Sequence, residues 1–113
     1  MNDERREHKR FTVTDLDLIL QEEEKLIGKV VNLSEGGLLI LSTAELESGK
    51  AYDFRIPFDQ TVNGEIHFDF EGEVVWCNQN TLDAKKFSAG LKFTQIPDLQ
   101  LTFVKQMITI FGK

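Results

Sequence analysis

The sequence has one cysteine, two prolines and no long apolar segment. The lone cysteine, Cys77, excludes an intrachain disulfide framework and fits a reducing compartment. No apolar run approaches the ~18 residues that span a bilayer. The charged first ten residues also lack the apolar stretch of a signal peptide. We therefore expect a cytoplasmic protein, or the cytosolic part of a larger one, with no membrane partner.

Basic residues are scarce and unevenly placed. Lysine and arginine number 13 against 19 aspartates and glutamates, which gives a net charge of −6. Residues 1–10 hold four basic and three acidic side chains, so they carry +1 and the remaining chain carries −7. Binding of DNA or RNA needs a basic face, so the composition argues against both partners. The N-terminal segment is the one place where basic residues are concentrated enough to attract a small anion.

Residues that support catalysis are also few. The two histidines, His8 and His67, lie far apart in the sequence, and neither belongs to a metal-binding or triad motif. The sequence has no phosphate-cradling P-loop and no dinucleotide fingerprint. We therefore expect no enzymatic activity, no metal site and no cofactor, which leaves a binding module.

The sequence does contain a series of apolar strands separated by turn residues. The pattern predicts six of them, at 16–20, 26–33, 38–41, 52–56, 65–76 and 87–93. Pro57 is expected to end the fourth. In the fifth, one face carries the apolar residues Ile66, Phe68, Phe70, Val74 and Trp76. This strand would span about 40 Å if straight, so we expect it to bend at Gly72. Long bent strands suit a closed barrel, which has no unpaired edge.

After Pro97 the apolar period changes to that of a helix. Its apolar residues cover an arc of roughly 200°, whereas a helix packed on a barrel needs about 100°. Part of this face, Ile110 included, is expected to stay exposed and to meet a second copy or a partner protein. The fold class is therefore mainly β, with one domain (1–113) made of an N-terminal arm (1–10), a six-stranded antiparallel β-barrel (11–95) and a C-terminal α-helix (97–112).

The N-terminal arm contains four basic residues within six positions: Arg5, Arg6, Lys9 and Arg10. Taken alone, this segment fits a flexible, solubilising end. Arginine also presents a planar fork that grips phosphate bidentately, hydrogen-bonds guanine and stacks on a base. Arg6 and Arg10, four residues apart, would flank one compact ligand from a single short segment.

A second segment of interest runs from Val31 to Leu38. It fits a plain strand–turn–strand connection, in which Asn32 and Ser34 cap the turn and a glycine takes positive φ. Alternatively, Asn32 and Ser34 point the same way at a period of two and face a ligand. Gly37 would then let the ligand or the arm approach the backbone closely.

Together the two segments resemble the PilZ domain family, bacterial receptors for the second messenger cyclic di-GMP. The family pairs an N-terminal RxxxR segment with a later [D/N]xSxxG segment. Arg6 and Arg10 match the first, and Asn32, Ser34 and Gly37 match the second, in the same order. The segments 74–76 and 90–93 also look like the family.

The resemblance implies that the arm folds over cyclic di-GMP held at residues 32–37. Arg6 and Arg10 would contact phosphate and guanine, and Asn32 and Ser34 would hydrogen-bond guanine. Arg5 is a third contact outside the strict motif. The predicted ligand-binding residues are Arg5, Arg6, Arg10, Asn32, Ser34, Gly36 and Gly37.

The expected mechanism is a switch in which ligand orders the arm and a protein effector reads the new surface. A PilZ-like adaptor that binds protein but no nucleotide is the alternative, and the retained motifs count against it. An oligonucleotide-binding barrel is disfavoured by the acidic barrel.

Overall fold

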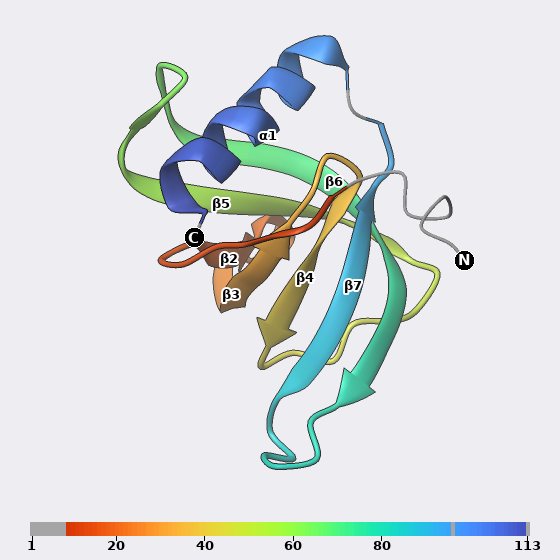
Figure 1. Cartoon of the computed structure of the whole chain (residues 1–113). Helices are drawn as coiled ribbons and strands as arrows, with labels where there is room; N and C mark the ends of the chain where they lie inside the picture. Colours follow the sequence, from red (N-terminus) through yellow and green to blue (C-terminus); the bar gives the residue numbers. More distant parts are fainter. Residues whose placement is uncertain (1–8, 96, 113) are drawn as a thin grey trace, which may run out of the picture.

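The computed structural model describes residues 9–95 and 97–112 and consists mainly of β-strands (Figure 1). The strands are β1 (Phe11–Thr12), β2 (Asp17–Leu20), β3 (Lys25–Leu33), β4 (Gly37–Ser42), β5 (Ala51–Val62), β6 (Glu65–Gln79) and β7 (Phe87–Phe93). A 3-10 helix, η2 (Gln21–Glu23), joins β2 to β3, and the helix α1 (Asp98–Phe111) follows β7. The flexible arm predicted at 1–10 lies outside the described residues except for Lys9 and Arg10.

Six of the strands close into an antiparallel barrel. Their order is β3-β2-β5-β6-β7-β4, and β4 pairs back onto β3. The short β1 lies outside this ring. It pairs with β3 at Asn32 and Leu33, beyond the stretch 25–29 that pairs with β2. The predicted six-stranded barrel with a C-terminal helix is therefore confirmed, with β1 as an addition.

Alternate strand residues fill the barrel. Leu16, Leu18 and Leu20 are all buried, as their period of two predicts. Phe54 and Phe70 stack with ring centroids 5.4 Å apart near the centre of the core. Burial of one large apolar side chain contributes roughly 1.5–3 kcal/mol, so this core alone explains why the chain folds without disulfides.

The prediction that Pro57 ends its strand is wrong. β5 continues to Val62, and Pro57 pairs with His67 of β6. β2 pairs with β5 only at Phe54 and Arg55, so the later part of β5 has an edge without a strand partner. A residue without an N–H is tolerated at such an edge. The strand then turns through Asn63 and Gly64, whose φ angles of 52° and 82° are those of a two-residue hairpin loop.

The register of β6 is regular at Gly72, where the sequence predicts a bend, and it shifts at Val75. Gly72 pairs in regular register with both neighbouring strands. The place of its missing side chain is taken by the rings of Phe54 and Phe70, which a Cβ would contact at 3.4 and 3.3 Å. The register with β7 shifts between Val74 and Trp76, so Val75 is the extra residue of a β-bulge, which bends and twists a strand.

The helix α1 lies across β5 and β6 at one end of the barrel (Figure 1). It buries Phe103, Val104 and Met107, while Leu99 stays 75% exposed and Ile110 41% exposed. The prediction that the apolar arc exceeds what the barrel covers is confirmed. Within the described residues, no helix is long and apolar enough to cross a membrane.

The end of α1 is tied to the segment that follows β1. Val13 forms an isolated antiparallel bridge with Gly112, and the Thr14 N–H donates to the Phe111 carbonyl at 3.2 Å. Phe58 of β5 stacks on both Phe103 and Phe111, with ring centroids 5.9 and 5.8 Å apart. Val13 and Thr14, which we call the root of the N-terminal arm, therefore pack against the last turn of α1.

Candidate functional site

The turn between β3 and β4 is organised by the hydroxyl of Ser34. Ser34 Oγ accepts hydrogen bonds from the N–H groups of Gly36 and Gly37, each at 3.2 Å, and donates to the Gly37 carbonyl at 3.2 Å. The Ser34 N–H also donates to that carbonyl, at 2.9 Å. Ser34 is 8% exposed. It therefore caps the turn, as one of the two sequence interpretations expects.

Gly36 and Gly37 are held against β7. The Phe93 N–H donates to the Gly36 carbonyl at 3.0 Å. A Cβ on Gly37 would lie 2.0 Å from the Leu91 carbonyl oxygen, so no side chain fits there. The backbone that approaches Gly37 closely belongs to β7, and the φ of Gly37 lies outside the left-handed region. The expected positive φ is not found at this glycine, because its role is to admit the neighbouring strand.

Arg10 is brought to this turn by β1. Phe11 pairs with Leu33 and Thr12 with Asn32, so one further step of the same register sets Arg10 opposite Ser34. Residues two apart on a strand share a face, which puts Arg10 on the same outer side as Thr12. Arg10 is exposed. Arg5 and Arg6 lie outside the described residues.

Asn32 belongs to a row of residues that crosses five strands on the outside of the barrel. The successive pairs are Thr12 with Asn32, Asn32 with Leu39, Leu39 with Gly90, and Gly90 with Trp76. Directly opposed residues of antiparallel strands project from the same face. We call this row the outer row; it is a continuous surface from β1 to β6.

Two β-bulges turn the ends of the outer row outward. In β3 the register with β4 shifts between Val30 and Asn32, and in β6 the shift lies between Val74 and Trp76. Without the bulges, Asn32 and Trp76 would share the inward face of the buried Val30 and Val74. Each bulge instead leaves a valine exposed, Val31 at 39% and Val75 at 55%. Bulges are common beside functional sites because they redirect a side chain.

Trp76 is the site residue that the sequence pattern misplaces. The period of two puts it inside with Phe68 and Val74, but the bulge at Val75 brings it out, and it is 38% exposed. Its indole lies over Gly90, where a Cβ would be 2.4 Å from Trp76 Nε1. The glycine opposite an aromatic residue was the available signal, because only a residue without a side chain lets the ring lie flat against the strand.

The charge around the turn is mixed. Lys92 pairs with Gly37 in register, and its ammonium lies 3.7 Å from Glu73 Oε1. Lys9 lies over the Phe11 ring at 5.5 Å, and Arg10 completes the basic side of the site. Across residues 9–95 and 97–112, no group of three or more metal-ligating side chains is close enough to hold an ion. The geometry suits an anionic, planar ligand bound by arginine, amide and aromatic groups.

Comparison with known proteins agrees with this geometry. A family model described as the PilZ domain matches residues 4–109. A search of curated protein sequences finds no match. Among solved structures, one similar to this chain is the PilZ domain of YcgR from Escherichia coli with c-di-GMP. Its TM-score is 0.75 at 14% identity, over 96% of this chain and 92% of that one.

Two longer proteins are also similar in structure. The inhibitor of motility MotI/DgrA from Bacillus subtilis gives a TM-score of 0.70 at 21% identity over 94% of this chain. YcgR from Escherichia coli in complex with c-di-GMP gives 0.70 at 16% identity over 93%. This chain spans 50% and 45% of those two proteins. At these identities the likeness concerns the fold.

Proposed function

The chain belongs to the PilZ domain family, and from that membership we propose that it is a non-catalytic receptor for cyclic di-GMP that acts in the cytoplasm. The observation that carries the proposal is the outer row, a surface that runs from Thr12, two residues after Arg10, through Asn32 to Trp76. The similar YcgR domain is described with c-di-GMP, which supports the same ligand for this chain.

Each part of the surface suits one part of the ligand. Arg10, with Arg6 and Arg5 upstream, supplies planar forks for phosphate and for the O6 and N7 atoms of guanine. Asn32 presents an amide that can hydrogen-bond a base edge. Gly36 is half-buried in the turn and has no side chain to keep a ligand from its backbone.

Trp76 adds a stacking surface at the far end of the outer row. A base stacked on an aromatic ring contributes roughly 1–3 kcal/mol to binding. Because Gly90 leaves the indole flat against the barrel, a guanine can lie over it without meeting another side chain from that position. We therefore include Trp76, which the motif comparison does not contain, among the ligand-binding residues.

The signal we propose is the ordering of the arm over the bound ligand. Residues 1–10 contain no apolar residue after Met1, so the arm has nothing to bury without ligand, and ordering costs ~1–2 kcal/mol per residue. Phe11 already lies in β1 and is half-buried. The moving part therefore ends at β1, and ligand phosphates supply the partners that fix the arginines.

A protein adaptor that binds no nucleotide is the second candidate. The exposed Leu99 and Ile110 of α1 favour it, because exposed apolar side chains beyond those that the barrel covers are available to contact another protein. The same surface would serve a receptor that passes its signal to an effector, or a homodimer formed through α1. Nucleotide binding therefore decides between the two candidates.

Calorimetry with cyclic di-GMP tests the proposal. We expect binding by the wild type, with cyclic di-AMP and GMP far weaker. Losing one bidentate arginine contact costs about 1–3 kcal/mol, so Arg10→Ala should weaken binding roughly ten- to a hundredfold. Arg10→Lys should restore part of the loss, because it returns the charge without the fork. Trp76 is the single tryptophan, so its fluorescence gives an independent readout.

Two results would contradict the proposal. Full rescue by Arg10→Lys would show that charge alone attracts the ligand. No heat and no change in tryptophan fluorescence at high micromolar cyclic di-GMP would favour the adaptor.

A further inference from the structure

A groove of about 260 Å³ lies between the first residues of β6 and the first half of α1. It is lined by Glu65, His67, Phe68, Asp69, Leu99, Gln100 and Phe103. We call it the acidic groove. It involves a different part of β6 from the outer row, which meets that strand at Trp76. The two surfaces are therefore separate.

The floor of the acidic groove is apolar. Phe68 of β6 and Phe103 of α1 meet there with ring centroids 4.9 Å apart. Each ring continues into an exposed apolar residue on its own element. Ile66, two residues before Phe68 on the same strand face, is 63% exposed, and Leu99, one helical turn before Phe103, is 75% exposed. Exposed apolar residues that extend a groove in this way mark a site of contact with another protein.

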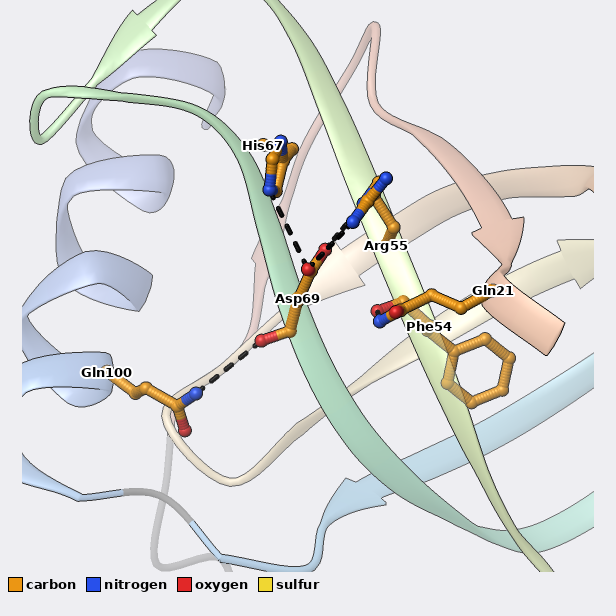
Figure 2. Close-up of polar contacts among 6 residues, drawn as sticks. All are labelled: Gln21, Phe54, Arg55, His67, Asp69 and Gln100. Atoms are coloured by element: carbon orange, nitrogen blue, oxygen red, sulfur yellow. Dashed lines mark hydrogen bonds and ion pairs between the residues drawn. The ribbon is translucent and has the colours of Figure 1, made fainter. Parts of the chain in front are cut away.

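One wall of the groove is fixed by a polar network (Figure 2). The Arg55 guanidinium donates to both oxygens of the Asp69 carboxylate, at 2.7 and 3.0 Å, and this bond lowers the pKa of Asp69. The Gln100 amide of α1 donates to the Asp69 carbonyl at 3.5 Å. These contacts hold β5, β6 and α1 together, so the groove is formed before any partner arrives.

The charge of the rim is negative. Arg55 is matched by Asp69, so this pair adds no net charge. Glu65 lines the groove, and Asp98 precedes Leu99 in the first turn of α1. Among the ion pairs formed within the described residues, none involves Glu65 or Asp98. The Glu65 carboxylate therefore stands beside the apolar floor without a basic partner from this part of the chain, and Asp98 adds a second negative charge next to Leu99 in the sequence.

We propose that the acidic groove binds a short segment of another protein in which a bulky apolar side chain is flanked by lysine or arginine. The apolar side chain lies against Leu99 over the floor of Phe68 and Phe103, and a basic residue beside it pairs with Glu65. A second copy of the chain is disfavoured, because each copy carries −6 and the same acidic rim, and like charges across an interface cost binding energy. The groove goes beyond the nucleotide site and does not depend on it.

Labelled synthetic peptides test the proposal by fluorescence anisotropy, without nucleotide. The probe has a Leu-Phe pair between two pairs of lysines; one control peptide has glutamates for the lysines, and another has alanines for Leu-Phe. We expect the full-length protein to bind the first peptide and the controls far less. Arg10→Ala should bind it like the wild type, so this test is independent of the nucleotide proposal.

Matched variants separate the groove from general charge attraction. Leu99→Ala should weaken peptide binding by about fivefold or more, as truncation of an interface anchor does. Leu82→Ala, in the β6–β7 connection, should not, although Leu82 is more exposed than Leu99, at 96% against 75%. Glu65→Lys should weaken peptide binding by a similar factor. Glu23→Lys, at the tip between β2 and β3, should change the peptide affinity by less than about twofold.

Several outcomes would overturn the proposal. Equal losses in the matched variants, or equal binding of the control peptides, would show that the net charge alone attracts the probe. No binding of the probe at millimolar concentration would also contradict it. Self-association of the wild type in sedimentation equilibrium that Leu99→Ala abolishes would assign the groove to a second copy.

Discussion

Two neighbouring motif residues, Asn32 and Ser34, have different surroundings and should respond differently to substitution. Ser34 is buried and its hydroxyl serves the turn, so Ser34→Ala should lower the free energy of unfolding by about 1–3 kcal/mol. Asn32 is half-buried on the outer row. Asn32→Ala should therefore leave the free energy of unfolding nearly unchanged and lower the affinity for cyclic di-GMP roughly tenfold or more. Thermal unfolding and calorimetry on both variants measure the difference.

The comparison requires that the effect on stability and the effect on ligand affinity can be measured separately. Ser34→Thr, which keeps the hydroxyl, should retain more stability than Ser34→Ala. If Asn32→Ala unfolds several degrees below the wild type while its affinity stays the same, Asn32 is a structural residue and the outer row is not the ligand surface.

At the residue scale, the sequence pattern singled out the polar candidates Arg10, Asn32 and Ser34 and misplaced Trp76. Arg10, Asn32 and Ser34 were accessible because they form a spaced motif whose residue types suit phosphate and guanine. Trp76 was not, because its face depends on a bulge at Val75. A valine gives no local sign of whether it lies in a regular strand or in a bulge. The sequence therefore does not show which residues after Val75 face the core and which face outward.

At the scale of elements, the last turn of α1 and the root of the arm should behave as a unit. A Cβ on Gly112 would lie 2.4 Å from the Ile108 carbonyl oxygen, so Gly112→Ala must shift the end of the helix. The Thr14 N–H, bonded to the Phe111 carbonyl, should then exchange with solvent about tenfold faster. Hydrogen exchange measured by NMR checks this amide.

The matched substitution is Thr109→Ala on the exposed side of the same turn. It removes only the hydroxyl bond to the Lys105 carbonyl and should leave the exchange of Thr14 unchanged. Amides of β7 serve as an internal reference. Unchanged protection of Thr14 in Gly112→Ala would show that the arm root does not depend on the helix.

The bounds of the strands and the helix show where the local sequence pattern is enough to predict the structure. The segments 87–93 and 97–112 were predicted almost to the residue, since both have a clear apolar period. β5 was cut short at Pro57, because the tolerance for proline depends on whether a neighbouring strand needs its N–H. That neighbour, β2, pairs with β5 only at Ile19 and Leu20, so no β2 residue pairs with Pro57. The sequence does contain a signal that β5 continues past Pro57, because Asn63–Gly64 is a typical two-residue hairpin turn and marks the end of the strand.

At the scale of the whole molecule, trypsin distinguishes the arm from the closed barrel. Lys9 and Arg10 are exposed, and cleavage there should be fast in the free protein. Saturating cyclic di-GMP should slow it strongly, because the ligand fixes the arm. Lys85 and Lys86, in the exposed β6–β7 connection, provide an internal reference whose cleavage should not depend on ligand. Mass spectrometry of the fragments follows both sites in one digest.

The proteolysis tests the mechanism separately from the ligand. If calorimetry shows tight binding while cleavage after Lys9 and Arg10 keeps its rate, the arm does not close over the nucleotide, and the ordering mechanism is wrong although the ligand is right.

The position of β1 has a consequence for shortened forms of the protein. β1 covers the part of the edge of β3 that β2 leaves unpaired, next to the exposed Val31. An uncovered strand edge is a template for pairing with another chain. A protein that begins after Thr12 would carry such an edge and would tend to aggregate through β3. Truncation of the arm therefore has to stop before Phe11, or the solubility of the protein changes together with its affinity.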